Sequence, residues 1–362
     1  MSTLTNQFCQ TSKGRGIPFT ILAVLAWLLS SCLGAAEAES VRIAGSAWVG
    51  DAPTRIADQL GLFNVDTSAA DPVIEVDQYA SGVEALQAMR DNHAEFALAA
   101  ATPVAAALLD ADFQEHGQPD LVVLASVALS NRSHKLIVRQ PFGDRDPAQW
   151  QDLRVGVMMG SSSHFGWSRF STFHGMDKDQ VTLVDLRVED MAGALIAGEV
   201  DAVLVWRPWD QALQDRIGDD LVEHSLRMFH TVNWLLVADR DHALQHPEVV
   251  GRVLQAYRKA MTLIDGDPEH AYGIYSDASG LPMELVRRSA DGMIWRLSLN
   301  WSALVAVTTQ LEWLATWGEF ADRTPPPPRQ YFHGQPLREL AEEIVNLADF
   351  MMMSEPTSSE GP

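Results

Sequence analysis

The chain has 362 residues and a formal net charge of −22 at pH 7. So negative a protein repels nucleic-acid phosphates, and we expect no nucleic-acid partner. Its two cysteines are Cys9 and Cys32, so a chain cleaved before Cys32 has no disulfide, cysteine nucleophile or zinc–thiolate site. The histidines form no metal-binding motif, and we expect neither metal nor cofactor. The remaining length of about 320 residues is sufficient for two lobes.

The N-terminus has the features of an export signal. An apolar run over 17–29 follows two basic residues and is too short to span a bilayer comfortably. We therefore predict a signal peptide over 1–31 and a linker over 32–40. Leu29-Ser-Ser-Cys32 resembles the lipoprotein box, in which Cys32 would be lipidated. A cut after Ala38 would instead release a soluble protein.

Short strands alternate with helices through most of the chain, as in parallel βαβ units. In the first half we expect strands over 41–45, 73–76, 94–99 and 121–128, with helices over 52–60, 82–89 and up to 107. In the second half we expect strands over 152–158, 181–184 and 202–206, with helices over 164–173 and 191–196. The second series repeats the first, which predicts two similar α/β lobes with a ligand cleft between them.

The joins between the lobes are predicted at two extended apolar stretches, 134–139 and 231–237, which we interpret as crossover strands forming a hinge. The predicted domains are 41–136 for the first lobe, 137–232 for the second and 233–350 for the return to the first. This last part is predicted to be helical over 249–263, 285–295, 303–317 and 337–350, with a polyproline spacer over 325–328. The tail over 351–362 is expected to be disordered.

One loop carries most of the chemical information. Gly160-Ser-Ser-Ser-His164 follows a predicted strand and precedes a helix, so its N–H groups and hydroxyls suit an anion or a polar head group. The alternative is that these serines only cap the helix. No nucleophile, base and orienting group occur together, and no paired carboxylates are evident, so the loop favours binding over catalysis. Asp51 and Glu189-Asp190 could meet an amine on the solute, but in so acidic a chain we expect acidic loop residues to be solvated.

Four segments together resemble a known family. They are Ile43–Pro53, Tyr79–Met89, Leu153–His164 and Gly198–Pro208, and their order and spacing hold across most of the chain. In these segments the chain resembles the extracytoplasmic substrate-binding proteins of ABC importers, in the nitrate, sulfonate and taurine branch. The resemblance implies an α/β fold of the type II periplasmic-binding-protein class, a two-lobed clamshell with two crossover hinge strands.

The same resemblance implies a set of ligand-binding residues. They are Ser46, Trp48, Tyr79 and Thr102 in the first lobe, Ser161, Ser162, Ser163, His164 and Trp206 in the second, and Asn131 near the hinge. Lobe packing is an alternative role for Trp48 and Trp206, and solvent exposure is the alternative for His164.

The implied partners are a small polar or anionic solute and a membrane permease with its ATPase. We expect a periplasmic monomer anchored through lipid on Cys32. A sensor that presents its closed state to a membrane receptor is an open alternative, since the residues do not separate sensing from import. An enzyme is a weaker alternative, because the enzymes of this fold that form a pyrimidine or cleave a sulfinate depend on cysteine chemistry, which the chain after Cys32 lacks.

Overall fold

A computed structural model describes residues 40–353, apart from 66, 111–113, 116–117, 141, 212, 214–219 and 349–350. The predicted signal peptide, most of the linker with Cys32, and the tail from 354 onward lie outside the described residues. Within the described part of the chain, no helix combines the length and apolar character needed to cross a membrane.

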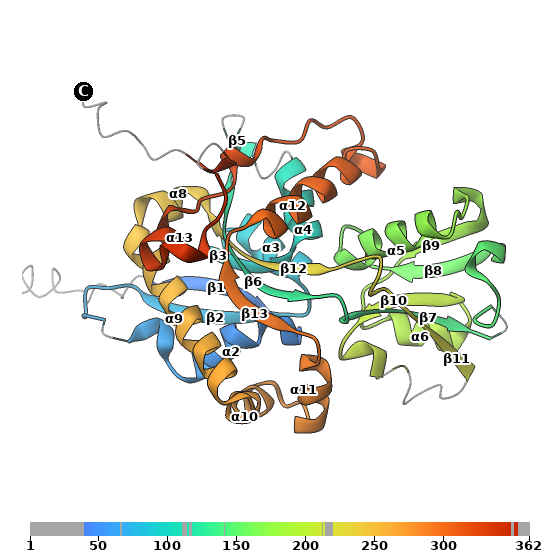
Figure 1. The fold of residues 1–362 in the computed structure, drawn as a ribbon, viewed down its shortest axis with the longest axis horizontal. Helices are drawn as coiled ribbons and strands as arrows, with labels where there is room; N and C mark the ends of the chain where they lie inside the picture. The colour runs from blue at the N-terminus through green and yellow to red at the C-terminus, as the bar shows by residue number, and fades with distance from the viewer. Residues whose placement is uncertain are drawn as a thin grey trace, which may run out of the picture.

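Two sheets form the centres of two lobes, which lie side by side in Figure 1. The first lobe contains a six-stranded sheet of β1 (Ser40–Ser46), β2 (Val73–Tyr79), β3 (Phe96–Ala100), β6 (Leu121–Ser130), β12 (Val232–Asp239) and β13 (Ile294–Ser298), in the order β13-β6-β12-β3-β1-β2. The second contains a five-stranded sheet of β7 (His134–Arg139), β8 (Leu153–Val157), β9 (Val181–Asp185), β10 (Ala202–Trp206) and β11 (Leu221–Ser225), in the order β11-β7-β10-β8-β9. A separate pair is formed by β4 (Gln114–Glu115) and β5 (Gln118–Pro119).

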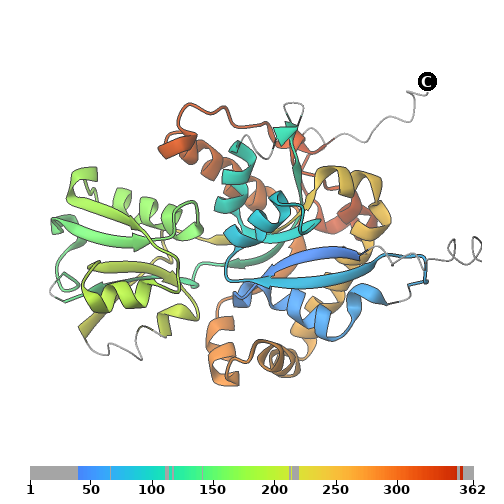
Figure 2. The same cartoon turned by 180° about the vertical axis from the view of Figure 1, so that it is seen from behind.

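Helices cover the sheets of both lobes (Figures 1 and 2). The first lobe has α2 (Ala52–Gln59), α3 (Gly82–Arg90), α4 (Ala101–Leu109), α8 (Arg240–Gln245), α9 (Pro247–Gly266), α10 (Pro268–Ser279), α11 (Met283–Ala290), α12 (Trp301–Leu314) and α13 (Gln335–Leu340), and the second has α5 (Ser162–Phe173) and α6 (Met191–Ala197). The short 3-10 helices are η1 (Val49–Asp51), η2 (Leu62–Asn64), η4 (Pro147–Gln149), η5 (Lys178–Gln180), η7 (Gly318–Phe320), η8 (Pro328–Gln330) and η9 (Glu342–Ile344).

The strands that position the binding loops are short and apolar because both of their faces are covered. Every residue of β3 and β10 is buried, as expected for central strands with helices on both sides. β1 runs parallel to β2 and β3, so the ends of these strands meet at one edge of the first sheet. β8 is likewise parallel to β10 and β9, and these strands end facing the first lobe.

The chain crosses between the lobes twice, at positions that differ from the prediction. The predicted crossover stretch 134–139 lies wholly within the second sheet as β7, where it pairs with β10 and β11. The stretch 231–237 falls almost entirely in β12, which pairs with β3 and β6 in the first sheet. The connections themselves are therefore residues 131–133 and 226–231, because the ladders on either side hold the predicted strands within single sheets.

Two predicted C-terminal helices were wrong in part. The helix expected over 285–295 ends at Ala290, and Ile294–Ser298 pair with β6 as β13. The helix expected over 337–350 ends at Leu340, because the backbone around Ile344 pairs with Leu299 instead. The sequence analysis also missed α10 and β11. In each case pairing or packing with a distant segment decided the local structure.

Candidate solute-binding site

A small pocket lies between the two lobes. We call it the inter-lobe pocket; its lining residues are Ser46, Trp48, Ala80, Ser81, Gly82, Val83, Ala100, Pro103, His134, Ser161, Ser162, Trp206, Val232 and Trp234. Its free volume is about 30 Å³. Residues of both lobes therefore meet around one small space.

The first-lobe loop, residues 46–51, is organised by a buried carboxylate. Asp51 Oδ2 accepts the backbone N–H of Ser46 at 2.7 Å, and Asp51 Oδ1 accepts the hydroxyl of Thr54. The Thr54 hydroxyl also lies 2.6 Å from the hydroxyl of Tyr257 on α9. Asp51 is fully buried, and its desolvation raises the pKa of this carboxyl to about 7. The expectation of a solvated Asp51 was wrong, since tyrosines of α9 and α10 cover it.

Trp48 forms the wall of the pocket in this loop. Its ring packs on Trp234 with 4.7 Å between ring centroids. The ring also lies over Gly50, where an added Cβ would approach it to 1.9 Å, so only glycine leaves room for this arrangement. The buried Trp48 Nε1 has no hydrogen-bond partner within the described part of the chain. A ligand acceptor that reached this donor would satisfy it.

The second-lobe loop, residues 158–164, is organised by hydroxyls and imidazoles. Ser161 is the N-cap of α5: its hydroxyl accepts the N–H of Ser163 at 3.2 Å and donates to the Met158 carbonyl at 2.6 Å. Ser162 Oγ lies 2.9 Å from His134 Nε2 at the start of β7. Burial, aided by the neighbouring His230, holds the pKa of His134 well below its usual value, so His134 is neutral at pH 7.

The pocket lining contains no aspartate, glutamate, lysine or arginine. Its polar lining residues are four serines, the neutral His134 and three tryptophans, and Ser161 and Ser162 place the N-terminal end of α5 in the lining. Such an N-terminus carries a partial positive charge and suits an oxyanion or a polar head group. The arrangement can hold a small acceptor-rich group without a counter-charge.

The structure brings together five of the ten residues predicted for the site. These five line the inter-lobe pocket: Ser46, Trp48, Ser161, Ser162 and Trp206. Their role in binding stays a prediction. The sequence analysis missed His134, Ser81 and Trp234 as lining residues. His134 comes into place because β7 lies antiparallel to β10, with His134 opposite Trp206, and strand order is not visible in the sequence.

The other five predicted residues lie elsewhere. Tyr79 is opposite Ser46 on β2, where its carbonyl accepts the N–H of Ala47 at 2.9 Å. Thr102 is buried and donates its hydroxyl to Gln310 on α12, and Asn131 is exposed in a connection between the lobes. Ser163 is fully buried against Ser161.

His164 is neither at the pocket nor exposed to solvent. It is 2% exposed and packs between lobes, with its ring centroid 4.3 Å from that of Trp317 and 4.8 Å from that of Trp313. Its Nδ1 accepts the N–H of Gly160 at 3.4 Å, which requires the neutral ring. Burial lowers the pKa of His164 to about 4, although Asp185 opposes the shift.

Two α/β lobes, two connections and a polar pocket between the lobes define a two-lobed solute-binding fold. A model of the NMT1-like family matches residues 34–275, and the chain belongs to this family. Within the described residues, no group of three or more His, Cys, Asp or Glu side chains is placed to hold a metal ion.

Individual relatives agree with this assignment. A Bacillus subtilis (strain 168) protein named as binding aliphatic sulfonates is 23% identical over 236 residues, 65% of this chain and 68% of that protein. The alkanesulfonate-binding protein SsuA from Xanthomonas axonopodis pv. citri, solved with bound MOPS, has a TM-score of 0.63 at 20% identity, covering 78% of this chain and 94% of SsuA. The periplasmic nitrate-binding protein NrtA from Synechocystis PCC 6803 also scores 0.63, at 16% identity, covering 89% and 93%. The structural likenesses show the fold.

Proposed function

We propose that the protein is the extracytoplasmic solute-binding component of an ABC importer. Its solute is a small polar or anionic compound of the sulfonate, taurine or nitrate kind. The observation that carries this proposal is the small inter-lobe pocket without charged side chains, lined by serines of both lobes and by the N-terminal end of α5. The names of the relatives support the sulfonate and nitrate classes.

The mechanism follows from the position of the pocket between two separately folded lobes. With the lobes apart, the first-lobe and second-lobe loops would be open to solvent. A solute that bonds to both loops stabilises the closed state over the open one, and this difference in affinity drives closure. Closure about residues 131–133 and 226–231 then presents one defined shape to a permease and its ATPase.

The place of the protein in the cell follows from the predicted signal peptide and from Cys32. We place it in the periplasm, held at the membrane by lipid on Cys32, and acting as a monomer. We propose binding and not catalysis, because the serines of the second-lobe loop bond to backbone, to one another and to the buried imidazole of His134. The other nitrogen of that imidazole lies 2.9 Å from the hydroxyl of Ser133 and not from a carboxylate.

Binding can be tested by titrating the purified protein with ethanesulfonate, taurine and nitrate while recording tryptophan fluorescence and heat. Trp48, Trp206 and Trp234 line the pocket, so binding should change the fluorescence. Absence of a signal for all three compounds by both methods would contradict the proposal.

A pair of serine variants locates the binding. Ser162→Ala should weaken the affinity for the bound compound about tenfold, the value of one hydrogen bond to a charged acceptor. Ser168→Ala, farther along α5 and outside the pocket lining, is the matched control and should leave the affinity unchanged. If Ser162→Ala and Ser168→Ala bound the solute with equal affinity, the second-lobe loop would not be part of the binding site.

A further inference from the structure

A second cavity lies on the opposite face of β12 from the inter-lobe pocket. Val232 and Trp234 line the inter-lobe pocket, and Asn233 between them lines this cavity, because successive residues of a strand point to opposite faces. We call it the hinge cavity, since its walls come from α5 of the second lobe, α12 of the first and the connection 226–231. Its free volume of about 310 Å³ lies within the usual range of small-molecule sites, about 300–1,000 Å³.

Two buried polar side chains of the hinge cavity each have an atom without a partner among the described residues. Asn233 is 2% exposed; its Oδ1 accepts the hydroxyl of Ser126 at 2.7 Å, and its Nδ2 has no hydrogen-bond partner there. His230 is 7% exposed, and its Nε2 is likewise unpartnered. Burial, together with the nearby charge of Arg169, lowers the pKa of His230 to about 4, so the ring is neutral at pH 7. Buried polar groups are normally paired, so a ligand that reached these two would complete their hydrogen bonding.

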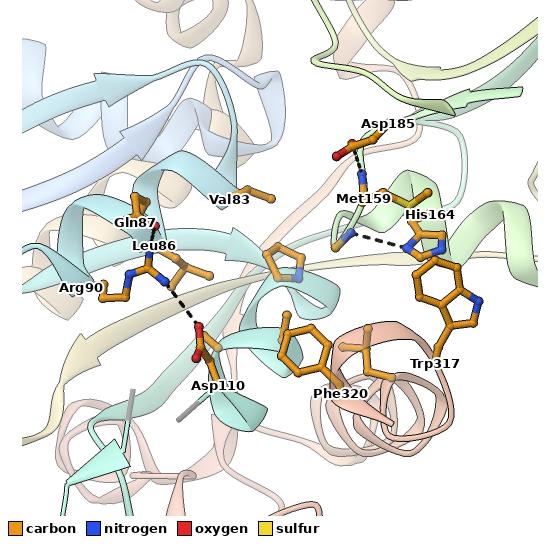
Figure 3. Close-up of a pocket in the computed structure, with 15 residues that line it drawn as sticks. Val83, Leu86, Gln87, Arg90, Asp110, Met159, His164, Asp185, Trp317 and Phe320 are labelled. Carbon is orange, nitrogen blue, oxygen red and sulfur yellow. Dashed lines mark hydrogen bonds and ion pairs between the residues drawn. The ribbon is translucent and has the colours of Figure 1, made fainter. Parts of the chain in front are cut away.

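Arg169 of α5 gives the hinge cavity a positive charge. Its side chain is exposed, and its guanidinium forms no hydrogen bond or ion pair with the rest of the described chain. The described lining residues include no aspartate or glutamate. The cavity in Figure 3 is different, because its arginine, Arg90, pairs with Asp110 at 3.3 Å. The charge of Arg169 is therefore available to an anionic ligand.

The remaining walls suit the body of a small organic molecule. Leu129, Phe165, Phe229 and Val305 provide apolar surface. The ring of Phe165 is held edge-on against that of His230, with 5.5 Å between the centroids. A guanidinium binds a planar carboxylate through two parallel hydrogen bonds, and apolar walls exclude water from the rest of a ligand. The cavity thus combines donors for a carboxylate with apolar surface for a ring or a branched chain.

We propose that the hinge cavity binds a small organic carboxylate with an aromatic or branched apolar body. Arg169 and the Nδ2 group of Asn233 would bind the carboxylate, and Phe165 and Phe229 would contact the body. This site goes beyond the proposed function and does not depend on it, because the hinge cavity and the inter-lobe pocket share no described lining residue.

The test measures the binding of benzoate and benzamide to the purified protein by calorimetry. Benzamide has nearly the same size but no charge, so it should bind at least about tenfold more weakly than benzoate, the value of one charge-assisted hydrogen bond. Arg169→Gln, at an exposed position that should tolerate the change, should reduce the benzoate affinity about tenfold and leave the benzamide affinity unchanged. Absence of benzoate binding, or equal affinities of the wild-type protein for benzoate and benzamide, would overturn the proposal.

Arg227→Gln is the matched control, because Arg227 is an exposed arginine of the connection 226–231 that does not line the hinge cavity. It should leave the benzoate affinity unchanged. An equal loss in Arg227→Gln and Arg169→Gln would mean that only the overall positive charge matters, and would overturn the proposed site. Ser162→Ala distinguishes the two cavities: a loss of benzoate affinity in this variant and not in Arg169→Gln would place benzoate in the inter-lobe pocket and overturn the proposal.

Discussion

The two loops that face each other across the inter-lobe pocket are held in shape by opposite kinds of titratable group. The first-lobe loop is organised by the carboxyl of Asp51, whose pKa burial raises to about 7. The second-lobe loop depends on imidazoles, and burial lowers the pKa of His164 to about 4. Burial favours the neutral form of each group. The contribution of Asp51 to the stability of the folded protein is therefore lost as the pH rises, and that of His164 is lost as the pH falls.

The largest expected effect comes from Asp51. In the folded protein its carboxyl stays protonated to about pH 7, whereas in the unfolded chain it ionises near 3.8. Its contribution to stability is complete below pH 3.8 and is lost as pH rises through about 7. One pKa unit corresponds to about 1.4 kcal/mol, so the unfolding free energy should change by a total on the order of 4 kcal/mol.

Asp51→Asn removes this titration while keeping the size of the side chain. The unfolding free energy of the wild-type protein, measured in urea relative to that of the variant, should fall by about 4 kcal/mol from pH 4 to pH 8. Asp277→Asn, at an exposed carboxylate of α10, is the control and should show no such trend. A pH-independent difference between the wild-type protein and Asp51→Asn would show that Asp51 is ionised in the folded state.

His164 provides the opposite test on the second-lobe loop. Its folded pKa of about 4 is below its usual 6.5, so its contribution is present above pH 6.5 and is lost as pH falls to about 4. Across this pH range, the unfolding free energy of the wild-type protein should fall by about 3 kcal/mol relative to that of His164→Gln. Protonation would also remove the acceptor that His164 Nδ1 offers to the Gly160 N–H.

The measurement is again urea unfolding, from pH 7.5 to pH 4, with His270→Gln as the exposed control. If His164→Gln and the wild-type protein lose the same unfolding free energy on acidification, the loss is caused by titratable side chains other than His164. Parallel results for Asp51 and His164, with both losing stability in the same pH direction, would break the contrast between the two loops.

The sequence predicted the architecture well, because strand and helix periods and strand-end glycines are local signals. It also located the Gly160-Ser-Ser-Ser-His164 loop correctly at a strand end. It did not predict which residues of the loop line the inter-lobe pocket. α5 begins at Ser162 and not at His164, and successive residues of a helix point about 100° apart, so Ser163 and His164 turn away from Ser162.

The burial of Asp51 and the position of His134 were not predicted, for a different reason. The burial of Asp51 depends on Tyr257 and Tyr275, which are more than 200 positions away in the chain. The position of His134 depends on the strand order β11-β7-β10. Neither the distant tyrosines nor the strand order can be recognised from a local pattern in the sequence. The chemistry that distinguishes the two loops is therefore set by tertiary packing, although the loops themselves are recognisable.

The smallest of these expected effects concerns the glycines of the two loops, which are required for different reasons. At Gly50 an added methyl group would lie 1.9 Å from the ring of Trp48, whereas at Gly160 nothing lies within 4 Å but the backbone φ is +71°. Gly50→Ala should lower the free energy of unfolding by about 1–3 kcal/mol, because the added methyl group overpacks the loop and shifts Trp48. Gly160→Ala should lower the free energy of unfolding by about 1–2 kcal/mol through backbone strain alone.

Ligand binding separates the two causes. Gly50→Ala should weaken the affinity for ethanesulfonate and alter the tryptophan fluorescence, because it moves Trp48 off Trp234. Gly160→Ala, if it folds, should leave the fluorescence of the unliganded protein unchanged. Gly251→Ala is the control, since Gly251 lies inside α9 with open space around it. It should raise the unfolding free energy by up to about 1 kcal/mol. If Gly50→Ala proved as harmless as Gly251→Ala, Trp48 would be mobile, and the first-lobe loop would not be the rigid side of the pocket.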